Sequence, residues 1–233
     1  MAALAPQPTD VVLDLAGGTG DMAEALAGRV AKVIETDLSP GMVEAARRRR
    51  LPATEHRQID MQAIDLPDDA VDAVVCRFGY MLVPERARAF SETRRVLKPD
   101  GRLAFSVWGP GKRNPWATVF GPVLVERGLM APPAPGEPGQ FALGEPEEIE
   151  RLLRAAGFHD AAVEEVAVES RFRSWDDYVG VMLSLSTLMR EALARLDDET
   201  RADVTEAARA RLDRFATDGG YALPGVALVT RAS

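Results

Sequence analysis

The feature that most constrains the fold is a stretch in which an apolar run passes through glycines into a helical pattern. Residues 11–15 form the apolar run, glycines occupy positions 17, 18 and 20, and a helical spacing begins at Met22. Glycine lets a ligand approach the backbone closely, and the N–H groups that open a helix have no partner within it. The stretch therefore predicts a buried strand, a ligand-binding turn and a helix, which together make a nucleotide-type site.

The first half of the chain alternates short apolar runs with helical patterns, which predicts a parallel sheet covered by helices. The expected strands are 11–16, 32–36, 56–59, 71–76 and 102–107, followed later by 162–172 and 221–230. The expected helices are 21–27, 41–50, 84–98 and 147–156. We predict an α/β fold with a doubly wound, mostly parallel, seven-stranded sheet, which is a Rossmann-like architecture.

The chain, residues 1–233, is long enough for one large α/β domain, and we expect a single domain. Range 110–140 is rich in proline and glycine and is predicted to be a long surface loop. Ser174 is the expected N-cap of a helix whose apolar stripe runs from Tyr178 to Leu196. A second helix has an apolar side that reaches Phe215, and Gly219 and Gly220 end it. We expect this insertion between the last two strands, residues 174–217, to form a helical cap.

The first expected strand begins at residue 11, so the segment before it supplies at most a frayed turn. We expect from this either a shortened chain or an unusually open pocket.

Composition excludes several classes of protein. The net charge of −8 argues against a nucleic-acid surface, and Arg47–Arg50 is better explained as favourable charge at a helix end. A single cysteine, Cys76, excludes a disulfide framework and a cysteine-cluster zinc site, and no metal site is expected. Neither a signal peptide nor a run long enough to cross a bilayer is visible, so we expect a cytoplasmic protein without a membrane span.

The charges around the glycines indicate which ligand they hold. Gly18-x-Gly20-x-x-Ala23 satisfies a loose dinucleotide fingerprint, which is a weak signal by itself. Asp14 lies before the glycines and Asp21 in the first helical turn, with no basic residue near the turn in sequence, which disfavours a diphosphate. We expect a cationic or zwitterionic ligand instead. Asp37, an acid at the end of the second strand, can accept hydrogen bonds from ribose hydroxyls. This feature is shared by dinucleotides and by cationic nucleoside cofactors, so it does not distinguish them.

At this point the sequence resembles a known family. Residues Val12–Gly20 resemble motif I of the class I S-adenosylmethionine-dependent methyltransferases, and are most similar to the type 11 and ubiquinone/menaquinone-biosynthesis enzymes. The resemblance continues in register through ranges 37–42, 60–72 and 94–102. The rest of the chain matches only in outline, around residues 155–158.

The resemblance implies S-adenosyl-L-methionine as cofactor. The residues it places at the methionine end are Ala16, Gly17, Gly18 and Arg77, the last through the carbonyl near it. The residues it places around the ribose and adenine are Asp37, Leu38, Met42, Asp60 and Met61. Asp14 is a further expected cofactor residue, because a sulfonium and an ammonium favour acids in the pocket. Taken singly, three of them have simpler roles: Asp14 as an acceptor for loop N–H groups, Met42 as core packing and Asp60 as a strand-end cap.

Methyl transfer from a sulfonium requires mainly that the acceptor be positioned, and a base only where the acceptor must lose a proton. His56 and His159 precede expected strands, away from the ligand edge, so the catalytic residue stays unassigned. The expected substrate contacts are aromatic or apolar: Tyr80, Trp108, Trp116, Tyr178 and Met182. They favour a small, largely apolar organic acceptor methylated at carbon or oxygen. For most apolar residues of the helical stripe between Tyr178 and Leu196, ordinary core packing is the alternative role.

Two other functions stay open on sequence alone. One is an NAD-dependent oxidoreductase, for which Tyr80 and Lys112 are weak proton-donor candidates. The other is a module that binds S-adenosylmethionine without catalysis. A small molecule is the expected partner, nucleic acid is not, and a homodimer is a further option.

Overall fold

The computed structural model describes residues 2–134 and 136–233; Met1 and Pro135, which fall in the expected domain and the expected loop, lie outside the described residues. We expected a single domain, and the chain divides into two compact units. The first comprises Met1–Trp108, Pro138–Val166 and Ala227–Ser233; the second comprises Gly109–Glu137 and Ala167–Val226. Each unit is described by itself below.

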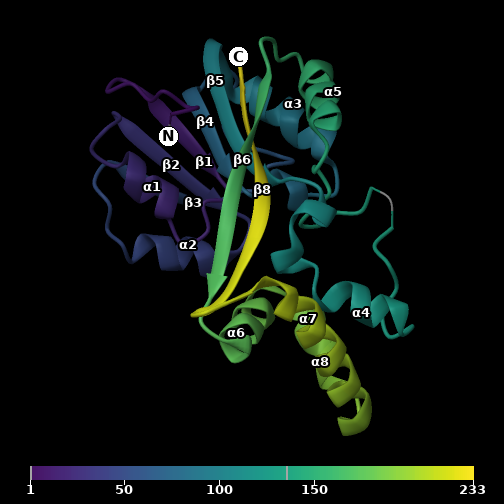
Figure 1. The fold of residues 1–233 in the computed structure, drawn as a ribbon. Coiled ribbons are helices and arrows are strands. Elements are labelled where there is room, and N and C mark those ends of the chain that lie inside the picture. The colour runs from purple at the N-terminus through teal and green to yellow at the C-terminus, as the bar shows by residue number, and fades with distance from the viewer. Residues whose placement is uncertain (1, 135) are drawn as a thin grey trace. The chain divides into compact units, whose positions relative to one another are not determined.

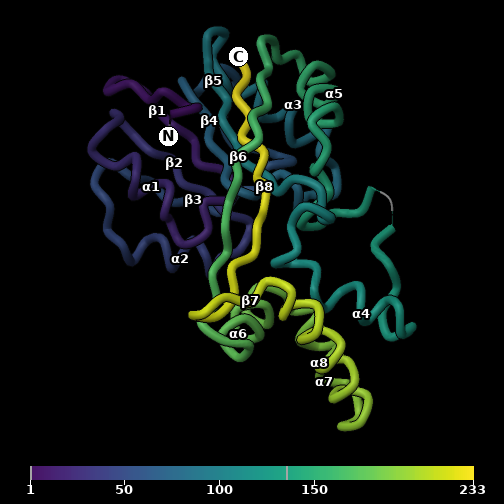
Figure 2. Tube along the Cα trace, viewed as in Figure 1, coloured from purple at the N-terminus to yellow at the C-terminus, as the bar shows by residue number. Residues whose placement is uncertain are grey.

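The sheet has the order β3-β2-β1-β4-β5-β8-β6, with a short strand β7 paired to β8 (Figures 1 and 2). The strands are β1 (Val11–Leu15), β2 (Lys32–Asp37), β3 (Thr54–Gln58), β4 (Val71–Arg77), β5 (Leu97–Trp108), β6 (Ala162–Phe172), β7 (Ala216–Thr217) and β8 (Gly220–Ala232). Strands β1 to β5 are parallel and β8 is antiparallel to β5. The predicted doubly wound, mostly parallel sheet is confirmed, and the two-residue β7 is added to the seven expected strands.

Helices cover both faces of the sheet in the first unit. They are α1 (Asp21–Leu26), α2 (Pro40–Arg47), α3 (Arg86–Val96) and α5 (Pro146–Ala155). Figure 1 shows α1 and α2 on one side and α3 and α5, which contact each other, on the opposite side. The strand order reverses between β1 and β4, which places a crevice at the carboxyl ends of these two strands.

One layer of the core lies between the sheet and α1. Alternation along β1 points Val12 and Asp14 to this face and Leu13 to the other. The cluster consists of Leu4, Val12, Ala23, Leu26, Val30, Val33, Ala73, Val75 and Ala104. Leu4 is 1% exposed, and its carbonyl accepts a hydrogen bond from Arg102 Nε (3.3 Å). The described residues ahead of β1 thus form turns, as expected, but they are anchored in the core and not frayed.

The first half of the predicted loop contains helices, whereas residues 127–134 and 136–140 carry no helix or strand. Range 110–140 contains the 3-10 helices η2 (Gly111–Arg113) and η3 (Pro115–Ala117) and the helix α4 (Phe120–Glu126). Helix α4 buries Phe120, Val123 and Leu124 and contacts α8. Its seven residues are too few to show a helical period in the sequence, and tertiary packing decides its conformation.

The long helix expected from Tyr178 to Leu196 is two helices, α6 (Trp175–Leu185) and α7 (Thr187–Ala194). Ser186 lies between them, and its hydroxyl accepts a hydrogen bond from the Met189 N–H (3.2 Å), as an N-cap side chain does. Helix α8 (Asp198–Leu212) follows, so helices do lie between β6 and β8 in the sequence. Within residues 2–134 and 136–233, no helix has the length and apolar character needed to cross a membrane.

Candidate active site

The glycine turn follows the carboxyl end of β1, and three of its residues have left-handed backbone conformations. Ala16, Gly18 and Gly20 have φ angles of 53°, 62° and 89°. The Gly17 N–H donates to the Thr36 carbonyl (2.8 Å), which ties the turn to the end of β2. A left-handed alanine costs roughly 1–2 kcal/mol. The fold therefore holds the turn in a defined shape before a ligand arrives.

No side chain fits at Gly17. A Cβ built there would lie 2.7 Å from Glu35 Oε1 and 2.9 Å from Asp14 Oδ2. A Cβ at Gly79, beyond β4, would lie 2.7 Å from the Ala16 Cβ. The glycines thus let the backbone pack directly against two buried acids and leave its other side accessible to a ligand.

Asp14 and Glu35 form a buried pair of carboxyl groups beneath the turn. They are register partners on adjacent strands, and both side chains are fully buried. Both Asp14 oxygens and Glu35 Oε1 lack hydrogen-bond partners among the described residues, while Glu35 Oε2 lies 2.8 Å from His56 Nδ1. Burial and the neighbouring Glu35 raise the pKa of Asp14, which Arg77 opposes only in part. Burial also raises the pKa of Glu35, while His56 lowers it.

Glu35 was not predicted as a site residue. Its signal was a single acid inside the apolar run Val33-Ile34-Glu35, equivalent to Asp14 in the first strand. A charged residue in a buried strand is costly unless it has a partner or a function. The pair places two buried acids, both with raised pKa values, directly beneath the glycine turn.

The buried Asp14 predicts an unusual pH dependence of stability. Its pKa in the folded protein is raised, so the folded state holds a proton that the unfolded state releases near pH 4. Folding stability is therefore favoured at low pH and falls as pH rises through the folded pKa. Asp14→Asn should flatten this fall and stabilise the protein by roughly 1–3 kcal/mol at pH 8.

Urea unfolding of both proteins between pH 4 and pH 8 measures this slope. Asp21→Asn is a control of opposite sign, because ion pairs lower the pKa of Asp21. Its stabilising contribution is present above the unfolded pKa and is lost on acidification. Parallel pH curves for Asp14→Asn and the unaltered chain would contradict the assignment.

Asp37 fixes the next part of the turn. Its Oδ2 accepts the Gly18 N–H (3.0 Å) and its Oδ1 accepts the Ser39 N–H (2.8 Å). The carboxylate is half-buried, so it retains lone pairs toward solvent. Nearby, Leu38 and Met42 are 62% and 44% exposed, which is unusual for apolar side chains.

A hollow of about 280 Å³ lies over the turn. Its lining residues are Asp14, Ala16, Gly17, Gly18, Thr19, Met22, Met42 and Arg77. Six of the expected cofactor residues are therefore brought together by the fold. Thr19 and Met22 were not predicted, although they belong to the same turn.

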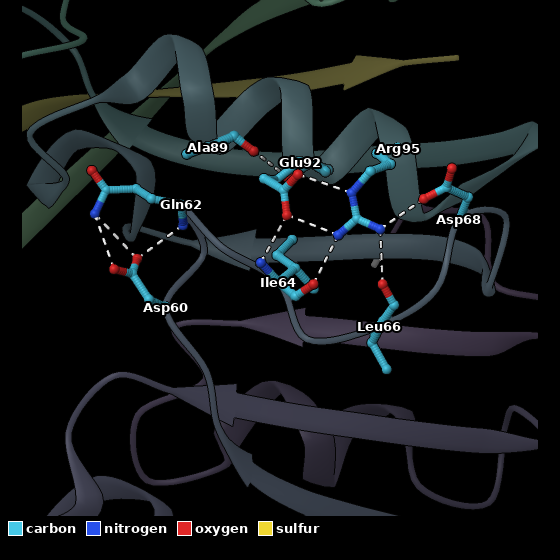
Figure 3. Close-up of polar contacts among 9 residues, drawn as sticks. Asp60, Gln62, Ile64, Leu66, Asp68, Ala89, Glu92 and Arg95 are labelled. Atoms are coloured by element: carbon cyan, nitrogen blue, oxygen red, sulfur yellow. Dashed lines mark hydrogen bonds and ion pairs between the residues drawn. The ribbon is translucent and has the colours of Figure 1, made fainter.

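The loop after β3 carries Asp60 and Met61 and is held by α3 (Figure 3). The Asp60 carboxylate accepts the Gln62 N–H (2.8 Å), which matches its alternative role as a cap. The Arg95 guanidinium donates to the carbonyls of Ile64 and Leu66 (2.8 Å each), and Glu92 accepts the Ile64 N–H (2.9 Å). These contacts give the loop a fixed position, and neither Arg95 nor Glu92 was predicted from the sequence.

The charge balance at the turn differs from the expectation. We expected no basic residue near Asp21, but Arg77 Nη2 lies 2.9 Å from its carboxylate and Arg49 pairs with the other oxygen. These arginines lie 56 and 28 residues away in sequence, so only the fold brings them together. Hydrogen bonds from Arg77 and Arg49 lower the pKa of Asp21, which is therefore charged and compensated.

Two expected substrate residues in the first unit have different positions. Trp108, at the end of β5, stacks on Phe78 with centroids 4.5 Å apart and planes 16° apart, and both rings are half-buried. Phe78 has a φ of 60°, an uncommon conformation for a bulky residue. Tyr80 is fully buried, and its hydroxyl hydrogen-bonds to Thr93 Oγ1 (2.7 Å). Contrary to our expectation, Tyr80 is a core residue that is not available to orient an acceptor.

The other three expected substrate residues form the interior of the second unit. Trp116, Tyr178 and Met182 are at most 5% exposed. The Tyr178 hydroxyl donates to the Trp116 carbonyl (3.0 Å), and its ring lies among Phe120, Phe172 and Trp175. This arrangement agrees with the alternative interpretation of the stripe as ordinary core.

Neither histidine is placed as a catalytic base for a ligand over the turn. His56 lies within β3, not ahead of it, and its ring contacts Glu35. The exposed His159 exchanges backbone hydrogen bonds with Ser233, near the carboxyl terminus. Among the described residues, no group of His, Cys, Asp and Glu has the arrangement of a metal site.

Comparisons with known proteins agree with this geometry. Residues 13–105 match the family model described as "Methyltransferase domain". The chain is 43% identical over 103 residues to a demethylmenaquinone methyltransferase of Clavibacter sepedonicus, covering 43% of this chain and 42% of that protein. It is 33% identical over 166 residues to the demethylmenaquinone methyltransferase of Thermus thermophilus, covering 63% of this chain and 73% of that protein.

The fold is shared with a solved structure from Bacillus halodurans assigned to the methyltransferases, with a TM-score of 0.68 and 22% identity over 100% of this chain and 95% of that one. The chain belongs to the class I S-adenosylmethionine-dependent methyltransferases. The chain spans less than half the length of several curated relatives that it matches.

The residues present fit the family's cofactor, S-adenosylmethionine. A Cβ built at Gly18 would meet nothing within 4 Å, so this side of the turn is open, and the unpartnered Asp14 carboxyl group lies beneath Gly17. A ligand with a sulfonium and an ammonium gains from acids in its surroundings, whereas a diphosphate does not. The buried acids therefore disfavour the NAD-dependent alternative, whose cofactor carries a diphosphate.

Proposed function

We propose that this protein transfers a methyl group from S-adenosylmethionine to a small, planar, largely apolar acceptor. The observation that carries the proposal is the glycine turn packed directly against the buried Asp14 and Glu35. The turn, the hollow over it and Asp37 would hold the cofactor. When bound, the cofactor supplies a methyl group on a positively charged sulfur, which an acceptor displaces in line.

The acceptor side of the proposal rests on Phe78 and Trp108. They are stacked at the carboxyl ends of β4 and β5, next to the strand that opens the glycine turn. A half-buried aromatic face suits a flat ring, and it excludes water from the side it covers. The chain's contribution to the rate would be positioning, because none of the described side chains near the turn is placed as a general base.

The relatives named above act on demethylmenaquinone, a quinone-type ring. We therefore propose a hydroquinone as the acceptor class, with the methyl group added to a ring carbon. The electron-rich ring of a hydroquinone is itself a nucleophile, so a strong protein base is not required for the carbon–carbon bond to form. The proton then leaves the same ring carbon to solvent.

Incubation with methyl-labelled S-adenosylmethionine and a short-chain naphthohydroquinone tests this function. We expect S-adenosylhomocysteine and a ring-methylated product in equal amounts, identified by mass spectrometry. A simple alcohol and an acidic peptide serve as acceptor controls and should remain unlabelled. Tight cofactor binding without transfer to any ring acceptor would instead support the non-catalytic alternative.

A further inference from the structure

Arg77 is the cationic residue among those that line the hollow over the glycine turn. It ends β4, and its side chain reaches Asp21, the first residue of α1 (2.9 Å). The side chain is 49% exposed, so part of the guanidinium is open to solvent.

The methionine end of S-adenosylmethionine is a zwitterion, with a carboxylate as well as an ammonium group. The other side chains that line the hollow are carboxyl, hydroxyl, apolar or absent. The first turn of α1 already carries two carboxylates, Asp21 and Glu24, so its N-terminus offers little attraction to a third. A guanidinium offers paired N–H donors that match a carboxylate, and this makes Arg77 the matching group.

We propose that the Arg77 side chain binds the carboxylate of the cofactor's methionine moiety, and that Asp21 holds the guanidinium ready for it. This inference rests on the proposed function and extends it to one cofactor contact. Arg49 takes the other Asp21 oxygen, so Asp21 retains a partner when Arg77 turns toward the ligand. Asp21 is a positioning residue in this arrangement, because it acts through Arg77.

Two ligands distinguish the contact to the carboxylate from binding of the nucleoside part that both ligands share. S-adenosylhomocysteine keeps the carboxylate and ammonium, whereas 5′-methylthioadenosine has the same nucleoside and sulfur without either. Arg77→Gln should weaken S-adenosylhomocysteine roughly ten- to hundredfold in calorimetry, since bonds to charged groups are involved. The same variant should change 5′-methylthioadenosine binding less than about twofold. Arg77→Lys should recover part of the loss, because it keeps the charge but not the paired donors.

Arg48→Gln is the matched control, because it removes an exposed ion pair, with Glu44, from a residue that does not line the hollow. It should leave both ligands within about twofold of the unaltered chain, since exposed ion pairs contribute little. Equal affinity of Arg77→Gln and the unaltered chain for S-adenosylhomocysteine would overturn the Arg77 assignment alone. An equal loss for both ligands would also overturn it. Failure of the unaltered chain to bind either ligand would overturn the proposed function itself.

Discussion

Gly17→Ala is expected to weaken S-adenosylhomocysteine binding at least roughly tenfold and to lower the free energy of unfolding by about 1–3 kcal/mol. The added Cβ would lie 2.7 Å from Glu35 Oε1 and 2.9 Å from Asp14 Oδ2, so the turn must move away from both buried acids. The move breaks the Gly17 N–H bond to Thr36 and shifts the backbone that contacts the ligand. Calorimetric titration and urea unfolding measure the two effects.

Gly180→Ala is the matched control for that substitution. Gly180 lies in α6 with nothing within 4 Å of an added Cβ. Alanine should stabilise this helix by roughly 0.5–1 kcal/mol and leave ligand binding unchanged. Undiminished binding by Gly17→Ala would show that the turn does not contact the ligand as we describe.

Asp37→Asn should raise the dissociation constant of S-adenosylhomocysteine roughly ten- to hundredfold, because charge-assisted hydrogen bonds are lost. The aspartate accepts hydrogen bonds from the Gly18 and Ser39 N–H groups and, as we propose, from the ribose hydroxyls. An amide keeps one acceptor oxygen and presents an NH₂ where the second acceptor is needed. Asp198→Asn, on a side chain that is 99% exposed, removes the same charge and should have no effect.

A double-mutant cycle combines Asp37→Asn with removal of the ribose hydroxyls from the ligand. It distinguishes a direct contact to the ribose from an effect of Asp37 on the conformation of the turn. A ligand without ribose hydroxyls should bind the unaltered chain weakly, and Asp37→Asn should weaken it little further. Additive losses would mean that Asp37 acts only on the loop backbone.

The sheet and the glycine turn are predictable from the sequence because their signals are local. The apolar run before Gly17 and the proline that opens α2 mark elements within a few residues. Helix α4 was missed because burial against α8, rather than its own short sequence, stabilises it. The break at Ser186 was missed because the apolar spacing continues across it.

Residues of the site that depend on long-range contacts could not be predicted. The pairing of Arg77 with Asp21 joins the end of β4 to the start of α1, and the Arg95 contacts join α3 to the loop after β3. Tyr80 was misplaced because its position after β4 does not reveal that its ring turns into the core toward Phe90. Glu35 did have a local signal, since a lone acid in a buried strand has to be explained.

The central claim is that the glycine turn binds S-adenosylmethionine, and a calorimetric titration of the unaltered chain tests it most directly. A ligand that binds only the folded state also raises its thermal stability, which provides a second signal from the same samples. We predict saturable binding of S-adenosylmethionine and S-adenosylhomocysteine and none of NAD. Saturable binding of NAD with no response to either sulfur compound would contradict the account.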